Sequence, residues 1–526
     1  MFKRANLLLI IILLIGGFAL RFINLGYSDY QGDEIKAFFN PKEDDDYIQF
    51  LLDQRKGPNQ FIVTGAIKGF TNNFENYFLT RLPFALSGIL SIYIFYLVVK
   101  RLFNERMALI STIFFVTNGF LIAFSRIVQY QSFVILLGLL SIYLYLKFRE
   151  KKSFYFVYLS FFSLAISILF HYDGVFFGLP ILVLFIQDFL KARKEKQRNF
   201  SLHSGGAVSL FLATLFVFYI PFVLNISTKT LDYWGGRITG EVSNKISSSY
   251  YLFTVYQPIY AIHFYILLST LGILFIFYPL IVKLFKKYLS KLKLQTEINK
   301  DMLIVFLWAI IPFAFLEGVV YIPGTHIYTY LIPVFIIMAY GVEKLLELNL
   351  FKYFEKITYV GLSFLAIFLF LQSYTIFVDH KSGEYPWQDK KFLFFTLNQP
   401  TARYHLSLFG FPYFRNWQEI RSSITGDNSI WYTTNERVSL ARYYINLPKN
   451  GDKIGYYVFI ERPQSLTANI SNLRTQRWVA KGNKPIKIIE NPSGNRTLIF
   501  RLPESFETDR VIKTANDEVN GNEEGN

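Results

Sequence analysis

The sequence predicts a polytopic α-helical membrane protein with about 11 transmembrane helices and a C-terminal extracytoplasmic mixed α/β domain. Three observations predict this fold class. The 526 residues are 52% hydrophobic and only 17% charged, with a mean hydropathy of +0.30. Eleven apolar stretches are long enough to cross a bilayer. Lys and Arg gather in short segments between these stretches, and a long polar region follows the last of them.

This composition excludes an ordinary soluble enzyme, because soluble chains carry about 25% charged residues. The absence of cysteine excludes a disulfide framework, a thiolate metal site and a cysteine nucleophile. The formal net charge of +16 could suggest nucleic-acid binding. The basic residues, however, lie in short runs between apolar stretches, which is the pattern of membrane topology. We therefore expect the lipid bilayer, and no nucleic acid, among the partners of the chain.

The eleven stretches set the predicted order of elements, since a bilayer core needs roughly 20 apolar residues per helix. The first resembles a signal peptide, but it has no small-residue cleavage site and is predicted to stay as a span. The predicted spans are residues 5–24, 82–99, 107–124, 132–147, 154–170, 174–190, 206–226, 260–282, 301–322, 327–346 and 357–378.

With eleven spans, every basic cluster in a short loop falls on the same side of the membrane. Basic residues in short loops stay in the cytoplasm. The sequence therefore predicts a multi-pass protein of the cell membrane with a cytoplasmic N-terminus and an extracytoplasmic C-terminus.

The polar segments divide the chain into three parts. Residues 1–378 form the transmembrane module, with a long first outer loop at 25–77. Residues 379–503 are predicted to form a soluble outer domain with strands at 430–433, 455–460 and 497–501 and a helix at 417–423. Residues 504–526 carry seven acids and two bases and are predicted to be a disordered acidic tail.

The first outer loop holds two candidate sites. Asp33 and Glu34 follow the first span, where partial desolvation can raise the pKa of a carboxyl group toward that of a general base. The alternative is a solvated acidic loop, since more acids follow nearby. Lys56 stands before Gly57 and Pro58 and can bind a lipid phosphate, or it can be an interfacial lysine whose charge reaches into water.

Three more candidates lie at outer ends of spans. Arg126, which is followed by Gln131, either binds an anion or has no influence on the membrane topology. His171 and Asp173 occupy a very tight turn between the fifth and sixth spans, where ionisable residues are functional candidates and where Asp173 could instead cap the next helix.

His326 and Tyr328 open the tenth span and could contact substrate. The alternative is an interfacial aromatic belt, which a chain with 36 tyrosines supplies in any case. A P-loop, a dinucleotide-binding glycine motif, a His-Glu-x-x-His motif and a Gly-x-Ser-x-Gly motif are all missing from the sequence.

The order of these residues resembles a known family. A first span that leads into Asp33-Glu34, a Lys-x-Pro segment at Lys56, and Arg81-Leu82-Pro83 at the second span resemble the membrane glycosyltransferases of the GT-C fold. The likeness is to glycosyltransferase family 39, which contains the dolichyl-phosphate-mannose protein mannosyltransferases and the bacterial aminoarabinose transferases of lipid A. It covers roughly residues 1–350.

The resemblance implies an enzyme that moves a sugar from a polyprenyl phosphate to an extracytoplasmic protein, lipid or glycan. It implies that Asp33 deprotonates the acceptor with Glu34 beside it, and that Lys56 lies near the carrier phosphate. Arg126 matches the arginine of a second family motif, and the acid that follows in the family is replaced here by Tyr130 and Gln131.

The remaining roles follow from location. Asp173 is the predicted substitute for the missing acid, His171 is grouped with the phosphate-binding cations, and Gln131, His326 and Tyr328 with substrate contacts. No ligand set with clear spacing is present, so no metal or other cofactor is predicted and a divalent-metal requirement stays open.

The alternatives are a lipid-linked glycan ligase or oligosaccharyltransferase, a transporter or flippase, and a non-catalytic membrane scaffold. A transporter would place ionisable residues near mid-membrane and show inverted repeats, whereas these candidates sit at the outer edge. The sugar, the acceptor, the carrier length and the oligomeric state do not follow from the sequence.

Overall fold

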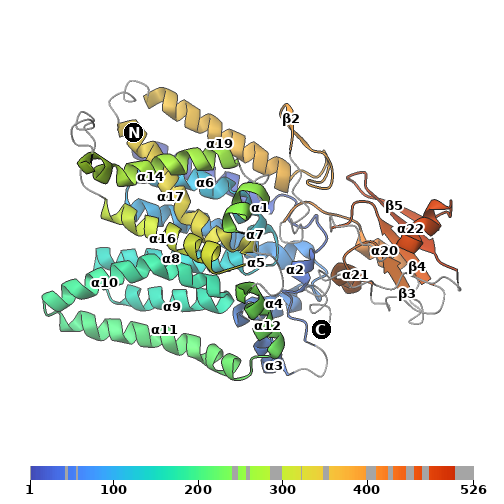
Figure 1. Ribbon diagram of the computed structural model, residues 1–526, viewed down its shortest axis with the longest axis horizontal. Helices are drawn as coiled ribbons and strands as arrows, with labels where there is room; N and C mark the ends of the chain where they lie inside the picture. The colour runs from blue at the N-terminus through green and yellow to red at the C-terminus, as the bar shows by residue number, and fades with distance from the viewer. Residues whose placement is uncertain are drawn as a thin grey trace.

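A computed structural model gives the arrangement of the chain (Figure 1). It describes residues 2–41, 46–54, 57–239, 247–255, 261–284, 299–321, 323–347, 355–397, 410–424, 431–445, 455–464 and 473–503.

Helices dominate the first three quarters of the chain, as the apolar stretches predict. The first group is α1 (Phe2–Phe22), α2 (Gly32–Ile35), α3 (Tyr47–Leu52), α4 (Pro58–Phe70), α5 (Tyr77–Leu102), α6 (Glu105–Thr117), α7 (Gly119–Arg126), α8 (Gln131–Lys151), α9 (Tyr155–Phe170), η1 (Tyr172–Phe177), α10 (Gly178–Lys194) and α11 (Arg198–Leu224). The second is α12 (Thr228–Thr239), α13 (Ser248–Tyr250), η2 (Tyr251–Val255), α14 (Ile262–Leu284), α16 (Lys300–Gly318), η4 (Gly324–Ile327), α17 (Tyr328–Glu347) and α19 (Glu355–Phe377).

The number of membrane crossings differs from the predicted eleven. Among the described residues, eight helices are long and apolar enough to cross a bilayer, and the bent pair α6 and α7 adds a ninth if it counts as one span. Two further apolar helices, Asn6–Phe22 and Tyr155–Phe170, are shorter. The chain is therefore a multi-pass membrane protein, while eleven crossings and the orientation stay predictions.

A bend of 58° separates α6 from α7. Asn118 has an extended backbone (φ −71°, ψ 127°), so the helix stops there and restarts. Its side-chain oxygen accepts hydrogen bonds from the main-chain N–H groups of Phe120 and Leu121 and thus caps α7. The bend moves Arg126, at the end of α7, toward the end of α1.

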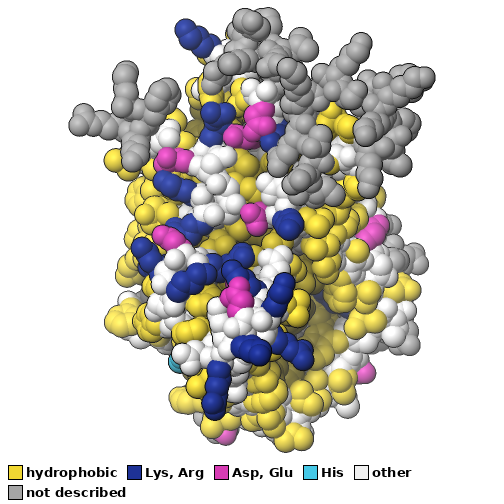
Figure 2. Space-filling model, turned by 90° about the vertical axis from the view of Figure 1, so that its left-hand side faces the viewer, with side chains coloured by type: hydrophobic (Ala, Val, Ile, Leu, Met, Phe, Trp, Pro, Cys, Tyr) yellow, Lys and Arg dark blue, Asp and Glu magenta, His cyan; other side chains and the backbone are white. Residues whose placement is uncertain are grey.

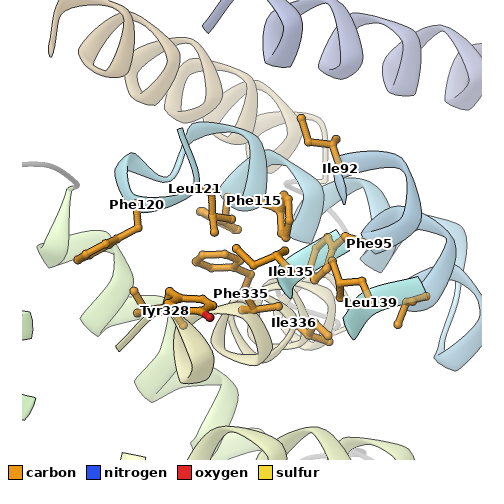
Figure 3. Close-up of a cluster of buried hydrophobic side chains, with 14 of the residues drawn as sticks. Ile92, Phe95, Phe115, Phe120, Leu121, Ile135, Leu139, Tyr328, Phe335 and Ile336 are labelled. Atoms are coloured by element: carbon orange, nitrogen blue, oxygen red, sulfur yellow. The ribbon is translucent and has the colours of Figure 1, made fainter. Parts of the chain in front are cut away.

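The core of the bundle is built around α17, which packs against α6, α14 and α16. In Figure 3, Phe335 and Ile336 of α17 face Phe115 of α6 and Ile135 of α8. All four side chains are buried. The ring of Tyr328, at the start of α17, belongs to the same buried cluster.

Lys and Arg gather on the end of the bundle that faces away from the C-terminal domain (Figure 2). Helices α5, α8 and α10 all have basic residues in their last turns. Acidic neighbours pair with some of them, as Glu105 does with Lys100 at 2.8 Å. The opposite end carries α2, α3, α4 and α12. The basic residues thus lie together at one end of the bundle, as the positions of the basic loops in the sequence predict.

The C-terminal region is a small mixed α/β unit, as predicted. It contains β1 (Lys391–Phe392), β2 (Phe395–Thr396), α20 (Trp417–Ser423), β3 (Trp431–Thr434), α21 (Val438–Tyr444), β4 (Gly455–Ile460), α22 (Leu473–Ala480), β5 (Lys487–Glu490) and β6 (Arg496–Arg501). The main sheet has the order β3-β4-β6-β5. Strands β3 and β4 are parallel, and β6 runs antiparallel to both β4 and β5.

The predicted helix at 417–423 and the predicted strand at 455–460 have the same bounds in the structure, and the other two strands differ by one residue at their ends. The division at residues 378 and 503 remains a prediction, and the predicted tail lies outside the described residues.

The C-terminal unit packs directly on the first outer loop. Tyr30 and Phe38 of that loop share a buried apolar cluster with Trp417, Leu440 and Tyr444. A buried ion pair of 2.5 Å joins Arg415 to Glu384, in the segment after α19. These contacts place the sheet beside α2, at the outer end of the bundle (Figure 1).

Candidate functional site

Glu34 forms a buried ion pair with Arg81. Both Nε and Nη2 of Arg81 lie 2.8 Å from the carboxylate, and neither side chain is more than 2% exposed. The carboxylate also accepts the main-chain N–H groups of Gln31, at 2.9 Å, and Val128, at 3.0 Å. A carboxylate has about four lone-pair sites, so this set of donors occupies all of them.

This environment favours a structural role for Glu34. Arg81 also donates to the main-chain oxygens of Leu25, Ser28 and Asp29, so the pair closes the turn between α1 and α2. The catalytic role predicted for Glu34 has no support in this geometry and stays a prediction. The sequence places Arg81 in the family motif, but a sequence alone does not show that it pairs with Glu34.

Asp33 is the neighbour of Glu34 on α2 and is half-buried. Its main-chain oxygen accepts a hydrogen bond from the side chain of Gln129. Four hydrogen bonds to the carboxylate of Glu34 fix the position of the short helix α2. They therefore also fix the backbone of Asp33, which is the neighbouring residue. The catalytic role of Asp33 stays a prediction.

Residues 127–131, which we call the connecting loop, run from the end of α7 to the first residue of α8 and contact both predicted acidic sites. Val128 donates to Glu34, and Gln129 donates to the backbone of Asp33. The ring of Tyr130 stacks on that of His171, with centroids 3.9 Å apart and planes 5° from parallel. Three consecutive residues therefore connect the first outer loop to the turn after α9.

Arg126 lies at the end of α7 and points toward the end of α1. Its guanidinium donates to the main-chain oxygens of Leu20, Ile23 and Asn24, at 2.9–3.3 Å. The last carbonyl groups of a helix have no partner within the helix, and a cation there is stabilising. This geometry gives Arg126 a capping role, and its predicted contact with the donor phosphate stays a prediction.

His171, Asp173 and His326 come together, and we call them the His–Asp–His cluster. The Nδ1 atom of His326 lies 2.8 Å and 3.0 Å from the two carboxylate oxygens of Asp173. The Nδ1 atom of His171 lies 3.3 Å from Oδ1 of Asp173. The side chains of His171, Asp173 and His326 are 4%, 2% and 12% exposed.

Local structure explains why these side chains meet. His171 ends α9 in an extended conformation, and its Nδ1 accepts the main-chain N–H of Asp173. Gly174 follows because a Cβ atom there would lie 2.8 Å from the backbone nitrogen of Ile168. The 3₁₀ turn η4 opens α17 and brings His326 over the same place.

Two predicted substrate contacts border this cluster. The hydroxyl of Tyr328 is buried beside the carboxylate of Asp173. Gln131 begins α8 and is buried, and its side-chain oxygen has no hydrogen-bond partner among the described residues. Unsatisfied buried polar atoms are rare in folded proteins and often mark a functional site.

Lys56 lies outside the described residues, so its predicted role is not addressed by the structure. Its neighbour Gly57 packs against the end of α9, where a Cβ atom would meet the main-chain oxygen of Leu169 at 1.9 Å. The Asn59 side chain donates to the main-chain oxygen of Ile166. The start of α4 therefore lies against the helix that carries His171.

Arg237 is a candidate that the sequence did not reveal. It lies on α12, near Tyr130 and Tyr172. Its guanidinium stacks over Tyr233 at 4.8 Å, and no described acid pairs with it. A cation without an acidic partner beside a cluster of tyrosines can receive an anionic ligand. In the sequence it is one arginine in a Ser- and Tyr-rich loop, so only the fold shows its neighbours.

Residues 63–219 match the sequence profile of a family described as dolichyl-phosphate-mannose-protein mannosyltransferase. This match confirms the predicted family resemblance. The matched segment includes Arg81, Arg126, the connecting loop and the turn that holds His171 and Asp173. Together with the helical bundle and the C-terminal sheet, it confirms the predicted fold class of a GT-C type membrane protein, apart from the helix count.

Similar solved structures include ArnT from Cupriavidus metallidurans. The form bound to undecaprenyl phosphate has 12% identity and a TM-score of 0.48, with 94% of this chain and 97% of that chain covered. The apo form has 10% identity and the same TM-score, with coverage of 94% and 98%.

The oligosaccharyltransferase AglB from Archaeoglobus fulgidus, in complex with an inhibitory peptide and a dolichol-phosphate, has 11% identity and a TM-score of 0.45. The match covers 71% of this chain and 55% of AglB. No curated protein matches the chain by sequence.

Proposed function

We propose that this protein is a membrane glycosyltransferase that moves a sugar from a polyprenyl-phosphate carrier to an acceptor outside the cytoplasmic membrane. The observation that carries the proposal is the connecting loop, which contacts Asp33 of α2 and His171 of the His–Asp–His cluster. The loop itself lies within the residues that match the mannosyltransferase family. Asp33, as the proton acceptor, and the His–Asp–His cluster, as polar side chains near an anionic leaving group, thereby lie at the same end of the bundle.

The proposed reaction needs few groups from the protein. The acceptor oxygen attacks the sugar carbon that bears the phosphate, the carbon–oxygen bond to the phosphate breaks, and polyprenyl phosphate leaves. Asp33 takes the proton of the acceptor. The leaving group carries its own stable negative charge, so positioned cations are sufficient to stabilise it. Lys56 and Arg237 are the cations we assign to the phosphate.

Other residues hold this site in place. Glu34 and Arg126 act as positioning residues. Arg81 and two main-chain N–H groups occupy the carboxylate of Glu34. Three main-chain oxygens at the end of α1 occupy the guanidinium of Arg126. Gln131 and Tyr328 keep the predicted substrate contacts. Among the described residues, the side-chain oxygen of Gln131 has no hydrogen-bond partner, and the hydroxyl of Tyr328 lies beside Asp173. The prenyl tail stays in the bilayer, and the C-terminal unit beside α2 contributes to the choice of acceptor.

Substitution of Asp33 by Asn tests the assignment. We expect turnover to fall by about 10²–10⁴-fold, because a positioned base contributes that much. Donor binding should stay within a few-fold, because the carboxylate acts on the acceptor. The measurement is release of labelled polyprenyl phosphate by purified protein, together with donor binding by titration. Asp53→Asn, at an exposed acid of the same loop, is the matched control.

Glu34→Gln should behave differently from Asp33→Asn. It leaves Arg81 buried without its anion, so it should lower thermal stability together with activity. Normal turnover in Asp33→Asn would contradict the proposal for this residue. If Asp173→Asn then lost turnover while it stayed folded and kept donor binding, the base would be in the turn after α9. A failure of wild-type protein to release polyprenyl phosphate from any lipid-linked sugar would contradict the proposed function itself.

A further inference from the structure

The His–Asp–His cluster has the composition and spacing of a metal site. Each of His171, Asp173 and His326 offers one ligand atom, and the three atoms lie within 4.8 Å of one another. Two imidazole nitrogens and a carboxylate oxygen form a set that first-row divalent ions accept. The ligands of a tetrahedral zinc ion are roughly 3.3 Å apart when its bonds are about 2.0–2.1 Å long. The observed separations of 2.8–3.3 Å to the Asp173 carboxylate are close to this value.

The backbone holds His171 against the carboxylate of Asp173. The main-chain N–H of Asp173 donates to Nδ1 of His171 at 3.2 Å. Oδ1 of Asp173 lies 3.3 Å from the same nitrogen. An ion bound at this nitrogen would replace the hydrogen bond from the main chain, because Nδ1 has a single lone pair.

The charge of Asp173 requires compensation. A buried carboxylate needs a compensating cation or a set of hydrogen bonds. Among the described residues, no Lys or Arg forms an ion pair with Asp173, and its recorded ionic contacts are the two histidines. A divalent ion held by all three side chains would compensate this charge.

The surroundings would support such an ion. The Tyr130 ring stacked on His171 fixes the plane of that imidazole. Outer contacts of this kind orient metal ligands. The hydroxyl of Tyr328 lies beside Asp173, and Arg237 of α12 lies near Tyr130. A ligand with negative charge would meet a second cation there.

We propose that His171, Asp173 and His326 bind one first-row divalent metal ion of the zinc class and leave a coordination position open for an anionic oxygen of the substrate. The open position follows from the count of three protein ligands, which is typical of zinc sites that take water or substrate as the fourth ligand. The role of the substrate rests on the proposed function, with a phosphate oxygen as the ligand class. The metal site itself does not depend on it.

Metal binding is tested on the full-length purified protein. After treatment with a chelator and titration with ZnCl₂, we expect about one tightly bound ion per chain by elemental analysis and a rise in melting temperature. Asp173→Asn and His326→Gln should each weaken binding at least about tenfold. His203→Gln is the matched control, because His203 contacts Phe154 and Tyr158, away from the cluster. Metal-free melting temperatures close to that of wild type show that the variants are folded.

Zinc binding that is equal in wild type, His326→Gln and His203→Gln would overturn the metal site, and so would no binding in wild type. The open position is tested with Co²⁺ in place of Zn²⁺. Addition of polyprenyl phosphate should change the visible spectrum of bound Co²⁺, and an unchanged spectrum at saturating lipid would overturn the substrate contact. These readouts do not use sugar transfer. Metal binding can therefore be confirmed even if the protein transfers no sugar, and it can be excluded even if the protein does transfer sugar.

Discussion

At the scale of single residues, Asp29 shows how burial changes the chemistry of the first outer loop. Its carboxyl group is 1% exposed and accepts the main-chain N–H of Arg415 at 2.5 Å. Burial raises the pKa of this carboxyl group to about 7, against the effects of that hydrogen bond and of the Arg415 charge. An acid beside α2 thus titrates near neutral pH.

The raised pKa of Asp29 predicts a pH dependence of stability. In the unfolded chain the carboxyl group titrates near pH 3.9, so between about pH 4 and pH 7 only the folded state holds the proton. The free energy of unfolding should therefore fall as pH rises through this window. The variant Asp29→Asn keeps an acceptor for the main-chain N–H of Arg415 but cannot ionise. The free energy of unfolding of this variant should therefore fall less over the same pH range. Melting curves in detergent at pH 5 and pH 8 measure the difference.

The control for Asp29 is Asp53→Asn, which changes an exposed acid of the same loop and should keep the wild-type profile. Identical profiles for Asp29→Asn and wild type would show that Asp29 is ionised in the folded protein throughout the range.

The sequence predicted the outer location of the candidate residues but not their partners. His171 and Asp173 are two residues apart in the chain, whereas His326 is 153 residues from Asp173, so no short spacing signals the cluster. The same holds for Glu34, which is 47 residues from Arg81. In both cases the polarity of the residues was visible, and the tertiary contact that decides their role was not.

At the scale of elements, the break between α6 and α7 positions the connecting loop. The sequence shows a single apolar stretch at 107–124, since an interruption of one residue does not change its hydropathy. The break depends on Asn118, whose side chain caps α7 and donates to the hydroxyl of Tyr265 at 3.3 Å. Outside the membrane the sequence was more informative, because alternation and turn residues in the soluble unit fix short strands.

Replacement of this cap should loosen the connecting loop. Asn118→Ala removes the acceptor for Phe120 and Leu121, and a lost cap costs about 1–2 kcal/mol. We expect lower thermal stability and faster hydrogen exchange in a peptide that covers 119–131. Asn104→Ala is the matched control, since Asn104 caps α6 at the exposed opposite end. Equal exchange of that peptide in both variants would contradict the link between the cap and the loop.

At the scale of the whole molecule, the C-terminal unit is joined to the bundle by buried contacts. Glu384 follows α19 and receives Arg415 at 2.5 Å and the Asn495 side chain at 3.0 Å. Tyr444 of α21 accepts the main-chain N–H of Tyr30 at 2.7 Å. The soluble unit and the first outer loop therefore form one packed layer, and substrate specificity is expected to depend on both.

The orientation of this layer can be tested by labelling, because the natural chain has no cysteine and gives no background. The basic ends of α5, α8 and α10 lie opposite the C-terminal unit (Figure 2), and basic ends stay in the cytoplasm. Ser422→Cys places an exposed thiol on α20, and Lys194→Cys places one at the end of α10. A membrane-impermeant maleimide should label Ser422→Cys in intact cells and Lys194→Cys only after permeabilisation. The reverse result would invert the topology and put the proposed site in the cytoplasm, where a lipid-linked donor would have to act on a different class of acceptor.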